Sequence, residues 1–217
     1  MPDAKQASVR PVLRRIPKQE RSRDRIDEIL KVAMDLIGQK GIDAVTMKEI
    51  AALSGGPIAS VYQYFPNKSA IIAMLYDRYI ANVTQFMTLG LSDVRGPDDI
   101  CRATDAMIDL YNLYVQGNPQ IQDLINAIQA DKMLGDMDLT ESRRLADLFA
   151  DATDQYIPEA LRAQYRRTTF MMCNLTVSAV RMALKAQPEE AKEIIAAFKL
   201  STRAQVSLFL DGSYASH

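Results

Sequence analysis

The chain has 217 residues and a formal net charge of −1, with 48% hydrophobic and 24% charged residues, as in most folded globular proteins. Its two cysteines, Cys101 and Cys173, are too few and too far apart for a zinc site or a disulfide framework. The longest apolar stretch, 170–184, is shorter than the roughly 20 residues of a membrane span, and charges stand where a signal peptide needs an apolar run. We therefore expect a cytoplasmic protein with no membrane segment, metal site or cofactor.

Charge is distributed unevenly along the chain. Residues 1–25 carry eight basic and three acidic side chains, a net charge of +5, which leaves −6 for the remainder. We expect residues 1–20 to form a basic, flexible arm, and such an arm on an acidic body indicates a polyanionic partner for the N-terminus. The alternative is a disordered tail that only keeps the protein soluble.

Beyond the arm, apolar residues recur with the period of an α-helix, and no alternating pattern typical of a strand appears. Gly41 supplies the left-handed residue that ends the first helix. Thr46 and Glu49 have the spacing of a capping box, which begins the second. The sequence therefore predicts an all-α protein of about nine helices, at 22–40, 46–53, 57–64, 67–90, 98–116, 119–130, 139–156, 158–186 and 189–211.

The second and third of these helices are short and are joined by Ser-Gly-Gly-Pro at 54–57, which cannot continue a helix. Ile50, Ala51 and Val61 are small or medium apolar residues at the point where the two helices would cross. This is the arrangement of a helix-turn-helix, whose second helix enters the major groove of DNA. Ordinary helical hairpins share it, so the geometry alone leaves DNA binding and simple packing both open.

The residues around this turn carry a more specific pattern. Thr-Met-Lys-Glu-Ile-Ala at 46–51, then Gly55, then Val-Tyr-Gln-Tyr-Phe-Pro-Asn-Lys at 61–68 resemble the DNA-binding domain of the tetracycline-repressor (TetR) family. The resemblance implies a DNA-binding domain over 21–81 and an effector-binding and dimerisation domain over 82–217. It also implies a homodimer, a two-fold symmetric operator, and a ligand that changes the spacing of the two DNA-binding heads.

Matched position by position, the resemblance implies DNA contacts on the two short helices and at the start of the next: Thr46, Ile58, Ala59, Ser60, Tyr62, Gln63, Tyr64 and Lys68. The amide of Gln63 can pair bidentately with adenine. Tyr62 and Tyr64 would reach phosphates or bases through their hydroxyls. The alternative is that their rings pack at the edge of the hydrophobic core. Lys68 would meet a phosphate, reinforced by the helix N-terminus, with a solvated lysine as the alternative.

The sequence also departs from the family pattern. Gly-Pro at 56–57 stands where Val-Ser is usual, Ile58 where a polar residue is frequent, and Ala59 where Gly is frequent. Ile58 could touch a thymine methyl instead, and affinity would then depend more on the arm. We expect Arg14 or Arg15 to enter the minor groove, the alternative being non-specific attraction that shows only in the salt dependence.

The C-terminal part is rich in methionine, which gives adaptable walls suited to apolar or aromatic ligands. The alternative is that these methionines only pack in the hydrophobic core. Asn174, in an otherwise apolar helix, needs a partner if buried, either a ligand or a neighbouring backbone group. The expected ligand contacts are Met107, Tyr111, Phe149, Met171 and Asn174.

The last two long helices are the expected dimer interface. The segment 170–184 is apolar nearly all round, as in a helix covered on both sides. Two such helices from each subunit would form a four-helix bundle about a two-fold axis. The expected interface residues are Phe170, Val177, Ile195, Phe198, Val206 and Phe209.

These patterns predict a ligand-responsive transcriptional repressor that binds a DNA operator as a homodimer and is released by a small apolar or aromatic molecule. An activator, or a regulator without an effector, on the same fold is the alternative. An enzyme is not expected, because no metalloprotease, phosphate-loop or serine-hydrolase motif occurs and the single histidine is the last residue, His217.

Overall fold

The structure is a computed structural model that describes residues 16–130 and 132–216, where all regular secondary structure is helical. This confirms the all-α prediction. Three short 3₁₀ helices, Asp154–Tyr156, Glu159–Leu161 and Ser213–Ser216, accompany nine α-helices. The α-helices are α1 (Ile16–Lys40), α2 (Met47–Leu53), α3 (Ile58–Tyr62), α4 (Lys68–Leu91), α5 (Pro97–Gly117), α6 (Gln120–Ala130), α7 (Lys132–Thr153), α8 (Arg162–Lys185) and α9 (Pro188–Leu210).

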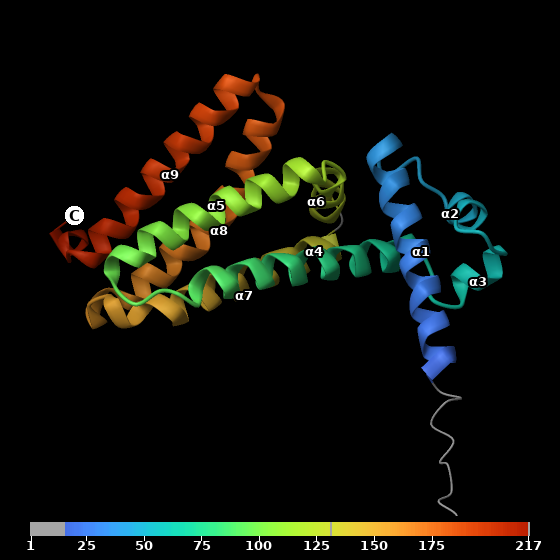
Figure 1. The fold of residues 1–217 in the computed structure, drawn as a ribbon, viewed down its shortest axis with the longest axis horizontal. Coiled ribbons are helices and arrows are strands. Elements are labelled where there is room, and N and C mark those ends of the chain that lie inside the picture. Colours follow the sequence, from blue (N-terminus) through green and yellow to red (C-terminus); the bar gives the residue numbers. More distant parts are fainter. Residues whose placement is uncertain (1–15, 131, 217) are drawn as a thin grey trace, which may run out of the picture.

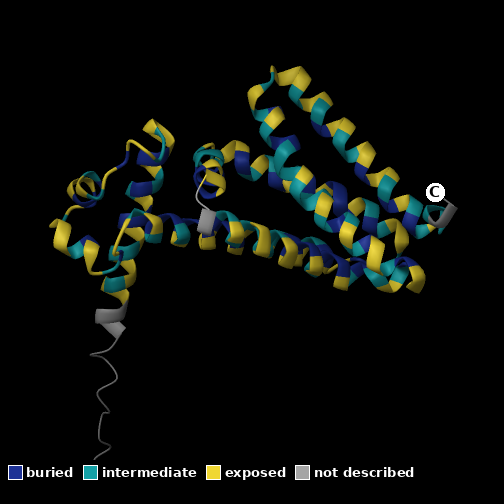
Figure 2. Ribbon diagram, turned by 180° about the vertical axis from the view of Figure 1, so that it is seen from behind, coloured by how far each residue is buried: buried dark blue, intermediate teal, exposed yellow. Residues whose placement is uncertain are grey.

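Helices α1 to α3 form a small unit at one end, and α4 leads from it into a larger bundle made with α5 to α9 (Figure 1). Helices α4 and α6 both pack against α1, so the bundle touches the small unit at two places. Buried positions lie on the inward sides of the helices and exposed positions on their outer sides (Figure 2). The hydrophobic core is continuous from Ile29 in α1 to Phe209 in α9.

Short-range signals in the sequence set several helix ends. Thr46 is extended and its hydroxyl accepts the backbone N–H of Glu49, while the Glu49 side chain accepts the N–H of Thr46, which confirms the capping box. Asn67 caps α4 by accepting the N–H of Ala70 at 2.9 Å. Gly41 has φ of 74°, as a helix-ending glycine requires.

Three helix starts differ from the sequence prediction by four residues or more. Helix α1 begins at Ile16 rather than Ser22, so the end of the expected arm is helical, and Arg14 and Arg15 lie outside the described residues. Helix α7 begins at Lys132 rather than at 139, and it contains Gly135. Helix α8 begins at Arg162 rather than at 158, after a 3₁₀ turn.

The expected division between residues 81 and 82 falls inside α4, which continues without a break. Tyr79 and Ile80 before it and Met87 after it are all buried in the same core. The two expected domains therefore share one continuous helix. Among residues 16–130 and 132–216, no helix combines the length and the apolarity needed to cross a membrane.

Candidate DNA-binding face and ligand cavity

Helices α2 and α3 pack as a helix-turn-helix. Ile50, Ala51 and Val61, which were predicted to lie at the crossing, are all buried. Between the helices Gly55 has φ of 72°, a conformation that residues with a Cβ rarely adopt. The N–H of Gly56 then bonds the carbonyl of Ala51 at 3.3 Å, closing the turn. The residues that the sequence assigned to packing are thus in the core, which leaves the opposite side of α3 free.

That free side and the start of α2 carry five of the expected DNA contacts. Ile58, Ala59, Tyr62 and Gln63 are exposed, and Thr46 is exposed at the start of α2. A five-residue helix that leaves an isoleucine and a tyrosine in water has a surface suited to contact with another molecule.

The other expected contacts among the described residues, Ser60, Tyr64 and Lys68, are half-buried and already bonded within the unit. The hydroxyl of Ser22 in α1 donates to the hydroxyl of Tyr64 at 3.3 Å, and Tyr64 packs against the core. The ammonium of Lys68 donates to the carbonyls of Ile42 at 2.7 Å and Val45 at 3.1 Å. A lysine has three N–H donors, so one remains for a phosphate, and that contact stays a prediction.

One side chain that organises this unit was not predicted from the sequence. Arg25 in α1 donates from Nη2 to Ser60 Oγ at 3.0 Å and from Nη1 to the carbonyl of Ser54. Arg25 lies one turn before Ile29 and so on the core-facing side of α1. An arginine on the core-facing side of a helix needs hydrogen-bond partners within the protein, so the sequence alone could have indicated a contact of this kind.

A cavity of about 280 Å³ lies inside the larger bundle. Helices α4 to α9 all contribute to its wall, and Met107, Tyr111, Phe149 and Asn174 line it as predicted. Met171 does not: it lies outside the wall with 47% of its surface exposed, so its assignment was wrong.

The polar groups of the cavity are mostly neutral and paired. The hydroxyls of Tyr79 and Tyr111 are 3.0 Å apart. Burial raises the pKa of Tyr111 to about 12, and burial also holds the pKa of Tyr79 well above its usual value. Burial raises the pKa of the Cys173 thiol to about 12. Asn174 donates to the carbonyl of Phe170 at 2.9 Å while lining the cavity, so it has a backbone partner and also faces the space where a ligand would lie.

Two family models match this chain. Residues 29–75 match the model described as bacterial regulatory proteins, tetR family, and residues 98–210 match the model of the tetracyclin repressor-like C-terminal domain. The second match alone covers more than half of the chain. The protein belongs to the TetR family. It is a transcriptional regulator with a helix-turn-helix DNA-binding domain.

Individual members resemble the chain only distantly. The uncharacterized HTH-type transcriptional regulator YdeS of Bacillus subtilis (strain 168) is 30% identical over 108 residues, which are 50% of this chain and 52% of YdeS. The chain spans about half the length of the curated relatives that it matches. A solved TetR-family regulator from Streptomyces coelicolor has a TM-score of 0.68 at 22% identity, covering 87% of this chain and 99% of that one.

A second solved structure is the SmeT–triclosan complex, with a TM-score of 0.62 at 16% identity over 89% of this chain and 91% of that one. SmeT is described as the repressor of the Stenotrophomonas maltophilia multidrug efflux pump SmeDEF. At such identities these two structures show that the TetR fold is shared.

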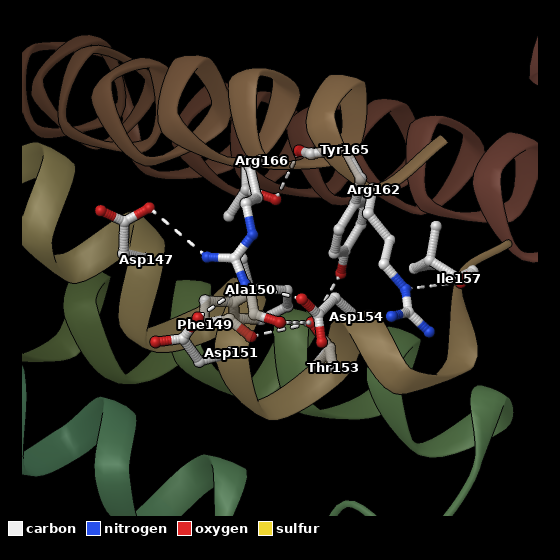
Figure 3. Close-up of polar contacts among 11 residues, drawn as sticks. Asp147, Phe149, Ala150, Asp151, Thr153, Asp154, Ile157, Arg162, Tyr165 and Arg166 are labelled. Atoms are coloured by element: carbon white, nitrogen blue, oxygen red, sulfur yellow. Dashed lines mark hydrogen bonds and ion pairs between the residues drawn. The ribbon is translucent and has the colours of Figure 1, made fainter. Parts of the chain in front are cut away.

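The corner between α7 and α8 is fixed by polar contacts at one end of this TetR-family bundle (Figure 3). The guanidinium of Arg166 faces three carboxylates, two of them at 2.6 Å and one at 3.8 Å: Asp151, Asp154 and Asp147. Hydrogen bonds with Asp151 and then Asp154 raise the pKa of Arg166. Beside them, the hydroxyls of Tyr165 and Thr153 are 2.9 Å apart. Because the three carboxylates surround the guanidinium of Arg166, they hold α7 and α8 together at this corner.

The outer faces of α8 and α9 differ from the expected dimer interface. Phe209 is 0% exposed, with its ring stacked on Tyr214 at 4.2 Å and edge-on to Tyr165 at 5.4 Å, so its assignment to a subunit interface was wrong. Ile195 and Val206 are likewise buried within the protomer, which corrects those two assignments as well. The remaining expected residues are half-buried: Phe170, Val177 and Phe198. Large apolar side chains that do reach the surface are Met171, Leu175 and Met182 in α8 and Leu200 in α9.

Proposed function

We propose that the protein is a ligand-responsive repressor, which binds a two-fold symmetric operator as a homodimer and leaves it when a small apolar or aromatic molecule fills the cavity. The observation that supports this most strongly is the course of α4. Its first residue, Lys68, is bonded to the loop before α2, and its later residues Tyr79, Val83 and Met87 line the cavity. A ligand that displaces this helix must also move the DNA-binding unit.

Helix α6 supports the same coupling by a second route. Ile125 and Gln129 line the cavity, while Gln120 at the start of α6 packs on α1 at Gly38. A Cβ at Gly38 would lie only 2.8 Å from the Cβ of Gln120, so the two helices are already as close as side chains permit. A ligand can change operator affinity only through contacts that differ between two arrangements of the protein. The contacts at α4 and α6 are suited to such a difference.

The cavity wall indicates the class of ligand. Its apolar part includes Phe86, Met107, Ile108 and Phe149, and its tyrosines present neutral hydroxyls, since burial raises the pKa values of Tyr79 and Tyr111 further above their usual value. A wall of this kind favours an apolar or aromatic molecule oriented by a few hydrogen bonds. The triclosan complex of SmeT, a protein of the same fold, supports a small-molecule ligand.

A homodimer would cover the apolar side chains on the outer faces of α8 and α9. Met171, Leu175 and Met182 recur at helical spacing along α8, and Leu200 stands on α9. Packing α8 and α9 against their copies about a two-fold axis would remove these side chains from water. Two heads related by that axis would read two half-sites separated by one or more helical turns of DNA.

The test begins with the DNA that the purified protein selects from a random duplex library. Affinity for the selected duplex is then measured by fluorescence anisotropy with triclosan and with a panel of apolar and aromatic compounds. Among the compounds that raise the melting temperature, those too large for the present cavity should also weaken DNA binding. If none of the stabilising compounds, large ones included, changes the affinity for the selected duplex, the ligand-responsive function is wrong.

A matched pair of variants ties the response to the cavity. Val83→Phe on α4 adds volume to the cavity wall and should abolish the response to the compound. Leu89→Phe, at an exposed position of the same helix, should keep it. A reporter gene behind the selected duplex separates repression from activation by the sign of the change in expression.

A further inference from the structure

Arg25 joins three elements of the DNA-binding unit with one side chain. From α1, its Nη2 and Nε donate to Ser60 Oγ in α3 at 3.0 and 3.3 Å, and its Nη1 donates to the carbonyl of Ser54. Ser54 is itself the residue that ends α2, with its N–H bonded to Ile50 at 2.9 Å. A guanidinium is planar and presents its donors in a fixed fork. The distance from the end of α2 to the start of α3 is therefore set by a rigid group.

Gly56 provides the space that this group occupies. Of the two glycines in the turn, Gly55 has a positive φ and Gly56 does not, so the backbone at 56 accepts any residue. A Cβ at Gly56, however, would lie 2.8 Å from Nη2 of Arg25 and 3.3 Å from Oγ of Ser60. The absence of a side chain at 56 is thus matched to the position of the Arg25 guanidinium.

The two bonds from Arg25 also define what Ser60 can offer to DNA. A hydroxyl has two acceptor lone pairs and one donor proton. Both Nε and Nη2 of Arg25 point to the oxygen of Ser60, so its acceptor capacity is used within the protein. Its proton remains free to be donated. Phosphate oxygens and the N7, O6 and O4 atoms of bases accept such a proton, whereas the amino groups of adenine and cytosine do not.

We propose that Arg25 is a positioning residue for DNA reading: it fixes the turn and α3 through Ser54 and Ser60, and it leaves Ser60 as a hydrogen-bond donor toward the operator. The proposal rests on the proposed operator binding. The competing role is a direct contact between Arg25 and a DNA phosphate, since no carboxylate of the described residues is paired with its charge. A phosphate contact would strengthen binding to every duplex alike.

The experiment compares a duplex that the wild-type protein selects from a random library with a scrambled duplex of equal length and composition. Arg25→Met, Arg25→Lys and the control Arg23→Met are measured at several salt concentrations; Arg23 is exposed on the same helix, so its replacement removes an equal charge. We expect Arg25→Met to lower the ratio of selected to scrambled affinity about tenfold, the scale of one hydrogen bond to a charged group. Arg23→Met should leave that ratio unchanged. Arg25→Lys keeps the charge and loses the planar fork. The logarithm of its affinity ratio should therefore lie closer to that of Arg25→Met than to that of the wild-type protein.

A variant that leaves Arg25 in place gives an independent result. In Gly56→Ala the added Cβ meets the far end of a flexible side chain, so the chain folds but the guanidinium must leave Ser60. Gly56→Ala should lower the affinity ratio as Arg25→Met does, and the two changes together should have little more effect than either alone. Circular dichroism and melting temperature establish that each variant is folded.

The outcomes separate the two proposals. If the wild-type protein selects no duplex, operator binding fails and the role of Arg25 fails with it. If the wild-type protein selects a duplex but Arg25→Met weakens both duplexes equally, with a shallower salt dependence and with Arg25→Lys close to wild type, Arg25 is a phosphate contact. If Gly56→Ala leaves the ratio unchanged, the positioning role is equally overturned.

Discussion

The proposed dimer interface can be tested at Leu200, the most exposed large apolar side chain among the described residues, with 69% of its surface in water. Replacing it by aspartate removes an apolar contact and would place a charge inside the proposed interface with the second copy. Because the interface is two-fold symmetric, one substitution changes the contact twice.

The size of the effect follows from the exposed area. Full burial of a leucine side chain contributes about 1.5–3 kcal/mol, so covering the exposed part of Leu200 contributes about 1–2 kcal/mol. Two copies give about 2–4 kcal/mol, which corresponds to a dissociation constant raised about 30- to 700-fold. A monomer has a single DNA-binding head, so affinity for a two-site operator falls as well.

Sedimentation equilibrium over nanomolar to micromolar concentrations measures the dissociation constant directly. Leu113→Asp is the matched control, because Leu113 is 61% exposed on α5, outside the proposed interface. Leu175→Asp, on α8, should act as Leu200→Asp does. If Leu200→Asp and Leu175→Asp dissociate no more readily than Leu113→Asp, the subunits meet elsewhere and the assignment of α8 and α9 is wrong.

Two further predictions concern stability. Burial raises the pKa values of Cys173 and Tyr111 to about 12 from 9.0 and 10.0, so the folded protein keeps both protons longer than the unfolded chain. The stability that these two protonated groups give the folded protein is fully present below pH 9. As the pH then rises toward 12, each group should lower the free energy of unfolding by about 1.4 kcal/mol per pH unit. Urea unfolding at pH 8 and 11 measures this, and equal stabilities would contradict it. Gly38→Val should cost about 1–3 kcal/mol by overpacking against Gln120, whereas Gly117→Val, with open space around it, should cost less in the same assay.

Much of the DNA-binding unit was predictable because its signals are local. The bonds of the capping box join Thr46 to Glu49, and the turn depends on Gly55, all within a few residues of the element that they define. Such contacts form whenever the segment folds, so the sequence pattern is enough to find them. The bond between Arg25 and Ser60 spans 35 residues and depends on how α1 packs on α3, which no local pattern contains.

The outer helices show the opposite case. A helix that is apolar on every side indicates burial but does not say which side another helix of the same chain covers. Phe209 was assigned to the subunit interface and lies in the core, while Met171 was assigned to the cavity and faces outward. The helix predicted to begin at 139 begins at Lys132 and contains Gly135. A glycine costs only about 1 kcal/mol inside a helix, and packing of α7 on α4, α6 and α8 offsets that cost.

The contacts at both ends of α4 would determine which ligands can act in the proposed effector response. Helix α4 has 24 residues and is therefore about 36 Å long, and a rotation at the cavity is transmitted along its length because a helix bends little. At its start, the two bonds from Lys68 to the carbonyls of Ile42 and Val45 join it to the loop before α2. A ligand that fits beside Tyr79 and Met87 without displacing them would bind tightly and leave the DNA-binding unit where it was. Tight binding and release from DNA are thus separate properties, and only a compound too large for the present cavity should have both.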